Sequence, residues 1–135
     1  MVAGPVWREG RVTDTAVLRW AGSEDRWWRR TAIVVTVALN QKARGGRGDT
    51  PRTLMMCERL AGDRDDMVVK GLSWALRELL VRDREAAEGF LKRHGDGVAA
   101  RVRREVGNKL ASGLKNPRGY CEAARGRPSF AACGR

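Results

Sequence analysis

Residues that commonly start helices recur along this chain at short intervals, and apolar residues at helical spacing follow each of them. They are Thr13-Asp14, Ser23-Glu24-Asp25, Asp49-Thr50-Pro51, Asp63–Asp66, Asp83 and Asp96-Gly97. No alternating apolar and polar run with a hairpin turn is found, and the β-branched run at 33–37 continues a helical pattern on both sides. The sequence therefore predicts an all-α fold.

The helix signals predict six helices, at about 13–20, 23–40, 49–61, 63–81, 83–94 and 96–113. The basic, glycine-containing segment 41–48 is expected to be a loop. Helices in pairs of roughly 35–45 residues are typical of α-solenoids, and a plain helical bundle fits the same pattern. Residues 1–114 are predicted to form one helical-repeat domain of about three pairs, and 115–135 a flexible basic tail.

The charge balance indicates a polyanionic partner. The 135 residues include 27 Lys and Arg against 16 Asp and Glu, a formal net charge of +11. Such an excess favours nucleic acid first and anionic membrane surfaces second. No apolar stretch is long enough to span a bilayer, and residues 1–12 contain no apolar segment of the kind found in signal peptides.

Metal and cofactor chemistry find little support in the sequence. The three cysteines are far apart and there is a single histidine, so neither a disulfide framework nor a zinc site is expected. Ser-His-Asp, P-loop, GxGxxG and HExxH patterns are all missing. We expect a protein without metal or cofactor in a reducing, cytoplasmic compartment.

Arg30 stands at the N-terminal end of an apolar stripe formed by Ile33, Val34 and Val37. An unpaired charge there would be costly to bury. Three arrangements would satisfy it: the guanidinium reaches water, an acidic side chain pairs with it, or an external phosphate binds it.

Lys70, Trp74 and Arg77 form a second stripe beside the apolar face of the helix expected at 63–81. An aromatic ring between two cations suits a nucleic-acid surface, because cations meet phosphates and the indole packs on sugar or base. Spacing alone favours the alternative that Trp74 belongs to the core. The core face itself is expected at Val68, Leu72, Ala75, Leu76 and Leu79.

The last expected helix turns Val98, Val102, Val106 and Leu110 inward and carries Arg101, Arg103, Arg104 and Lys109 elsewhere. Such a charge run usually marks a solvated face. Residue type alone assigns Trp20, Trp27 and Trp28 to packing rather than base stacking. Glu78 and Glu105 lie beside Arg77 and Arg104, and local pairing explains them better than acid–base chemistry.

Three segments resemble AlkD-type DNA alkylation-repair glycosylases. The segment 23–33, SEDRWWRRTAI, is similar to that family's S-x-[DN]-x-W-x-x-R-x-A-I, and 69–78, VKGLSWALRE, is similar to its q-K-A-I-G-W-x-L-R-E. Arg103-Arg104-Glu105 resembles its R-E-A element. The resemblance covers about residues 1–112 and the spacing between the segments also fits.

The resemblance implies a superhelix of HEAT-like repeats with a concave basic surface for double-stranded DNA. The family hydrolyses the glycosidic bond of cationic N3- and N7-alkylated purines without needing to flip the base into a pocket. Arg30 would hold backbone phosphate and Trp74 would contact the deoxyribose of the lesion. Trp27, Lys70, Arg77, Arg103 and Arg104 complete the expected DNA-binding set, on a chain expected to be monomeric.

One element of the family pattern is missing. Its main catalytic aspartate lies in a W-x-x-x-D segment, and no such segment occurs here. Residues 1–6 resemble the stretch just after it, while Asp14 and Asp25 are too close to Arg30 to replace it. The chain is therefore expected to match the C-terminal half of the family. Three explanations are open: the reading frame is truncated, the protein is a DNA-binding remnant without catalysis, or a partner protein supplies the carboxylate. A protein-interaction scaffold is a further alternative.

Overall fold

The computed structural model describes residues 3–117, and all of their regular secondary structure is helical, with no strand in that range. The α-helices are α1 (Ala3–Arg8), α2 (Asp14–Ala21), α3 (Arg26–Val34), α4 (Val37–Asn40), α5 (Thr50–Arg59), α6 (Asp66–Arg82), α7 (Arg84–His94) and α8 (Ala100–Ser112). A 3₁₀ helix, η1, spans Lys42–Arg44. The predicted all-α class is confirmed.

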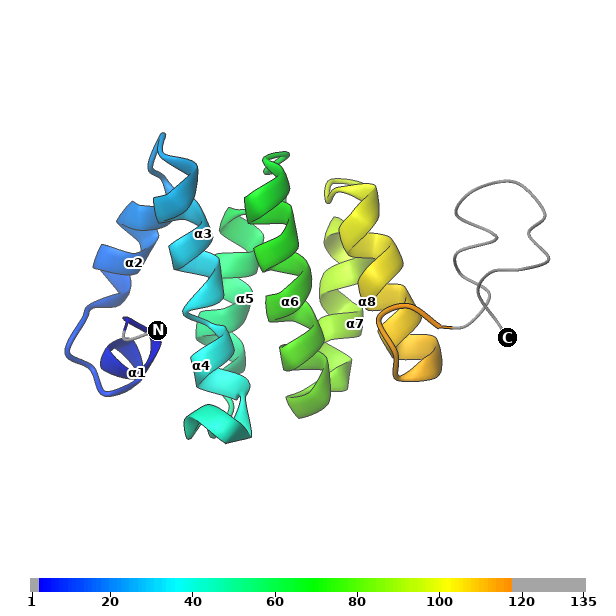
Figure 1. Cartoon of the computed structure of the whole chain (residues 1–135), viewed down its shortest axis with the longest axis horizontal. Helices are drawn as coiled ribbons and strands as arrows, with labels where there is room; N and C mark the ends of the chain where they lie inside the picture. The colour runs from blue at the N-terminus through cyan, green and yellow to red at the C-terminus, as the bar shows by residue number, and fades with distance from the viewer. Residues whose placement is uncertain (1–2, 118–135) are drawn as a thin grey trace, which may run out of the picture.

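The helices lie in two rows (Figure 1). The near row consists of α3 with α4, then α6, then α8, and neighbours along it are in contact. Behind it, α2 contacts α5 and α5 contacts α7. Since α6 touches α3, α4, α5, α7 and α8, it is the central helix of the described chain.

Side-chain caps explain where most helices begin, because an oxygen there accepts a hydrogen bond from an otherwise unpaired backbone N–H. The capping residues are Thr13, Asp25, Asp49, Asp65 and Asp83, at the starts of α2, α3, α5, α6 and α7. Each lies within a helix-start signal of the sequence, so these predictions are confirmed.

The prediction of a single helix at 23–40 is wrong, because the helix is interrupted between Val34 and Val37. At the break the Thr36 hydroxyl donates to the carbonyl of Ile33 at 2.6 Å. Its own N–H also bonds to Ile33, at 3.2 Å, in a three-residue turn. A threonine that bonds back to the preceding turn commonly bends a helix. Residues 32–40 are all buried, so the apolar pattern runs through the break without marking it.

The short helix α1 was not predicted from the sequence. Packing stabilises it: Trp7 is fully buried and its indole N–H donates to Asp14 at 2.8 Å. Gly4 allows α1 to approach α4, since a Cβ there would lie 2.4 Å from the Cβ of Ala38. Tertiary contacts of this kind stabilise a short helix that has weak intrinsic signals.

Two further boundaries differ from the sequence prediction. The last helix starts at Ala100 rather than at 96–97, and the expected loop 41–48 contains η1. After η1 the chain turns at Gly45, whose φ of 75° is favourable only for glycine.

The predicted core residues are buried in both helices where they were expected. In α6 these are Val68, Leu72, Ala75, Leu76 and Leu79, and in α8 Val102 and Val106. Val98 is also buried but lies just before α8 begins. Leu110 is only partly buried. Of the tail expected at 115–135, residues 118–135 lie outside the described part, and the division at 114 stays a prediction.

Candidate nucleic-acid interface

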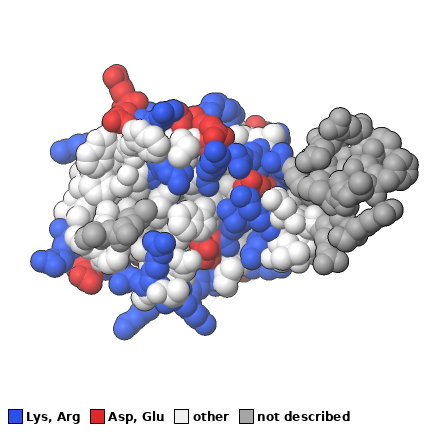
Figure 2. Space-filling view, in the orientation of Figure 1, with Lys and Arg blue, Asp and Glu red and all other residues white. Residues whose placement is uncertain are grey.

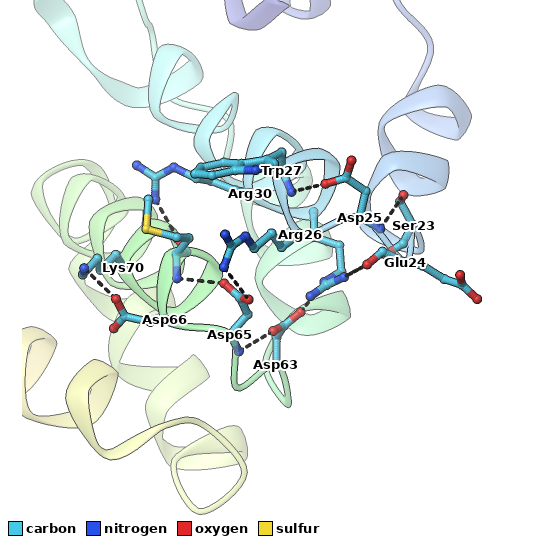
Figure 3. Close-up of polar contacts among 12 residues, drawn as sticks. Ser23, Glu24, Asp25, Arg26, Trp27, Arg30, Asp63, Asp65, Asp66 and Lys70 are labelled. Atoms are coloured by element: carbon cyan, nitrogen blue, oxygen red, sulfur yellow. Dashed lines mark hydrogen bonds and ion pairs between the residues drawn. The ribbon is translucent and has the colours of Figure 1, made fainter.

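Arg30 lies at the contact between α3 and α6. Its Nη1 donates to the main-chain carbonyl of Met67 at 2.6 Å (Figure 3). The close approach depends on Gly71, because a Cβ at that position would be 2.8 Å from Ile33 Cγ2 and 3.7 Å from Arg30 Nη1. The half-buried guanidinium therefore lies over the first turns of α6.

The cations around Arg30 are paired with the acidic residues in and just before the first turn of α6. Their ion pairs are Arg29–Asp63 at 2.7 Å, Arg26–Asp65 at 3.9 Å, Lys70–Asp66 at 2.6 Å and Arg101–Asp66 at 3.3 Å. The hydrogen bond from Lys70 holds the pKa of Asp66 below its usual value.

Arg30 differs from these neighbours. Within the part of the chain that the structure describes, no ion pair joins it to a carboxylate, so the possibility of an acidic partner for Arg30 is not realised. Its charge is left for water or for an external anion. A guanidinium with unused N–H donors suits a phosphate oxygen.

Trp74 lies on the same side of α6 as Arg30. Gly71, which Arg30 overlies, and Trp74 are three residues apart, a spacing that puts them on one helix face. The indole is half-buried and packs against the core, so Trp74 is neither sealed in nor fully exposed. Its Nε1 donates to Glu78 Oε1 at 3.3 Å, and the guanidinium of Arg44 lies 5.7 Å from the ring centre.

Lys70 and Arg77 flank Trp74, as the spacing predicts. Lys70 is exposed and Arg77 is half-buried. The Nε of Arg77 donates to the carbonyl of Ser73 at 3.2 Å, and the hydroxyl of Ser73 donates to Glu105 of α8. Lys70, Trp74 and Arg77 therefore span the α6 surface between its neighbours in the near row.

Glu105 joins α6 to α8 from a buried position, with 2% of its surface exposed. It accepts hydrogen bonds from Ser73 at 2.5 Å and Arg101 at 3.0 Å, and Lys115 lies 3.5 Å away. Burial acts to raise the pKa of Glu105, but these hydrogen bonds and charges outweigh it and leave the pKa below its usual value. Local pairing is thus confirmed for Glu105, with Arg101 as the partner one turn away.

Arg103 and Arg104 are both exposed on α8. Arg104 follows Arg101 by three residues and shares its side of the helix, which is the side that contacts Asp66 of α6. Arg103 follows by two residues and lies on the other side. The structure thus places Arg104 on the side of α8 that faces α6. Arg103 lies on the side of α8 that faces away from α6, at the outer edge of the near row.

The tryptophans of α3 are more exposed than a packing role requires. Trp27 and Trp28 are 51% and 49% exposed, and of these three tryptophans Trp20 is the one that packs against the core. Trp27 lies three residues before Arg30 and therefore shares its face, with the Arg26 guanidinium 5.1 Å from its ring centre. Trp28 lies 5.5 Å from Trp20, ring centre to ring centre.

Two residues near Trp74 were missed as site residues. Arg44 belongs to the segment 41–48, which was expected to be a basic loop. The sequence showed that this segment is positively charged but not that it lies near Trp74. Glu78 was assigned to pairing with Arg77, yet its carboxylate accepts a hydrogen bond from the Trp74 indole.

Lys and Arg side chains are spread over the near face. Figure 2 shows blue side chains over the middle of this face, with smaller red patches among them, and further blue side chains at its left and lower edges. In residues 3–117, no group of His, Cys, Asp and Glu could hold a metal ion, and no helix is long and apolar enough to cross a membrane.

A family model described as "DNA alkylation repair enzyme" matches residues 2–110. The chain belongs to this family. The match spans every described helix up to the last residues of α8, and so includes both Arg30 and Trp74. No curated protein and no solved structure matches the chain.

Proposed function

We propose that this DNA alkylation repair family member binds double-stranded DNA as a monomer across the face of α3, α6 and α8. In this proposal the helix pairs α2–α3, α5–α6 and α7–α8 are HEAT-like repeats whose near row forms a concave basic surface. Removal of cationic N3- and N7-alkylated purines by hydrolysis of the glycosidic bond is the proposed reaction.

The common face of Arg30 and Trp74 is the observation that carries the proposal. Arg30 has free donors for a phosphate, and the Trp74 ring lies one helical turn further along α6. Lys70, Arg77, Arg104 and, at the outer edge, Arg103 would add phosphate contacts, with Trp27 beside Arg30.

The chemistry assigned to this surface needs no cofactor. A purine alkylated at N3 or N7 is already cationic and leaves as a neutral base, so the sugar takes on positive charge as the glycosidic bond breaks. The face of an aromatic ring stabilises such a cation. Trp74, half-buried beside Arg30, is the residue proposed to contact the deoxyribose.

A second candidate is DNA binding without excision. It is favoured by one observation, the lack of a W-x-x-x-D segment in the sequence. In that case the same face would hold alkylated DNA without hydrolysing it.

Release of 7-methylguanine from a methylated duplex distinguishes the two candidates. The excision proposal expects release faster than spontaneous depurination, and loss of that excess with Trp74→Leu, which keeps an apolar side chain but removes the aromatic ring. Retained DNA binding with release at the spontaneous rate supports the second candidate. A chain that binds no duplex DNA at low salt rejects both.

A further inference from the structure

Glu78 stands apart from the other acidic residues of the described chain. Among those that are buried or half-buried, most are paired with a cation: Asp14 and Asp49 with Arg52, Asp63 with Arg29, Asp65 with Arg26, Glu88 with Arg84, and Glu105 with Arg101. Asp83 caps α7 and accepts a second hydrogen bond from Thr50. Glu78 has one contact in the described part, with the neutral indole N–H of Trp74.

The position of Glu78 makes its lack of a cation partner informative. It lies one turn after Trp74 on α6 and lines a hollow of about 300 Å³ beside the end of α4. Lys42, Val81 and Arg82 line the same hollow. The guanidinium of Arg82 is occupied, since it donates to the carbonyls of Asn40 and Gly46 at 2.6 Å each.

A carboxylate on a basic surface weakens binding to ordinary DNA, because it repels phosphate and offsets a nearby cation. It favours binding only where the DNA itself carries positive charge. Alkylation at N3 or N7 gives a purine that charge, and DNA alkylation is the damage that the description of this chain's family names.

We propose that Glu78 and Trp74 together form a recognition site for a positively charged, alkylated purine nucleotide. The Trp74 ring packs on the nucleotide and the Glu78 carboxylate attracts its cationic ring, so Glu78 is the residue that selects charged over neutral bases. This inference rests on the proposed function, because the surface must first hold DNA.

A purely orienting role for Glu78 would require only that it accept the hydrogen bond from Trp74. Glu78→Gln separates the two roles, since the amide oxygen of glutamine still accepts that bond while the negative charge is gone. Glu85→Gln is the matched control. Glu85 is exposed on α7 in the far row, and its substitution changes the net charge by the same amount.

The test compares the dissociation constants of three duplexes by fluorescence anisotropy. One carries 7-methylguanine on a 2′-fluorinated sugar, which slows base loss, one carries the uncharged 7-deaza-7-methyl isostere, and one is unmodified. Wild type and Glu85→Gln should favour the cationic duplex over its isostere by about fivefold, the size of a partly screened ion pair. Glu78→Gln should bind both equally, with no loss of affinity for the unmodified duplex.

Two outcomes overturn the inference while DNA binding stands: a wild type that binds duplexes without preference for the charged one, or a Glu78→Gln variant that retains the preference. Failure to bind even the unmodified duplex at low salt instead rejects the proposed function itself. Circular dichroism of each variant shows whether the helical fold is retained.

Discussion

Glu105 is the residue whose ionisation contributes most clearly to the fold. Its carboxylate lies between α6 and α8 with Ser73, Arg101 and Lys115 around it, and its pKa is below the usual value. A carboxyl with a lowered folded pKa stabilises the protein above its unfolded pKa, and this contribution is lost as the pH falls through the folded value.

We therefore expect Glu105→Gln to lower the free energy of unfolding at pH 7 by about 1–2 kcal/mol, because a hydrogen-bonded charge is lost. The deficit relative to wild type should shrink once the pH falls below 4.5, the ordinary value for this group. Urea denaturation at several pH values measures both. Glu88→Gln removes an exposed pair with Arg84 and should change stability by less than about 0.5 kcal/mol. An equal deficit at pH 7 and pH 3 would contradict the assignment.

At the scale of the element, the contact between α3 and α6 depends on the missing side chain of Gly71. Alanine there raises helix propensity, but its Cβ would meet Ile33 Cγ2 at 2.8 Å. Overpacking of this kind costs about 1–3 kcal/mol. We expect Gly71→Ala to lower the melting temperature and also to weaken DNA binding, because Arg30 rests on the same turn of α6.

Gly107 provides the matched control for this prediction. It too lies within a helix, α8, but a Cβ there would have no atom within 4 Å. Gly107→Ala should therefore stabilise the protein, by about 0.5–1 kcal/mol. If the two alanines shift the melting temperature alike, close packing at Gly71 is not what requires glycine.

The elements also show what sequence reasoning could and could not reach. Helices that begin with a side-chain cap, such as those after Asp25 and Asp65, were predicted because the capping signal is local. The helix break at Thr36 was not, because its hydrogen bond to Ile33 lies inside a continuous apolar run without a turn signal. The helix around Trp7 was not, because it is stabilised by its contacts with Asp14 and α4. Residues 32–40 are buried on every side and so carry no amphipathic pattern to show where one helix stops.

At the scale of the whole molecule, the proposed DNA binding predicts that affinity depends on the net charge of +11 and on the cations of the near face. Affinity for duplex DNA should fall steeply and linearly with salt on a double-logarithmic plot, because each neutralised phosphate releases counterions. Arg30→Ala should reduce the affinity and make the slope shallower by about one unit. Anisotropy titrations at several salt concentrations measure both quantities.

Arg93→Ala is the control for that measurement. Arg93 lies on α7 in the far row, where it faces Glu58 of α5 at 3.6 Å. The substitution Arg93→Ala removes the same formal charge as Arg30→Ala, but the slope of affinity against salt should stay at the wild-type value. Equal effects of the two variants would show that DNA responds to total charge and not to the face of α3, α6 and α8.

Only part of the candidate site could be predicted from the sequence, because some of its contacts join segments that are far apart along the chain. Arg30 and Trp74 lie in segments with recognisable motifs, and their residue types suggest phosphate and sugar contacts. Arg44 meets Trp74 from thirty positions earlier in the chain, through the turn after α4, and no local pattern encodes that approach. Glu78 was visible but was assigned to the wrong neighbour, since its lack of a cation partner is evident only in three dimensions.

The central helix α6 serves two purposes with alternating residues. Leu72 and Leu76 are buried in the core, while Trp74 and Glu78 are half-buried and share another side of the helix. A substitution on α6 thus risks the fold along with the surface chemistry. The exposed turn at η1 carries Arg44 to the same ring without adding a residue to the core. Variants with altered substrate choice should therefore arise more readily in that turn, which offers directed evolution a starting point that spares stability.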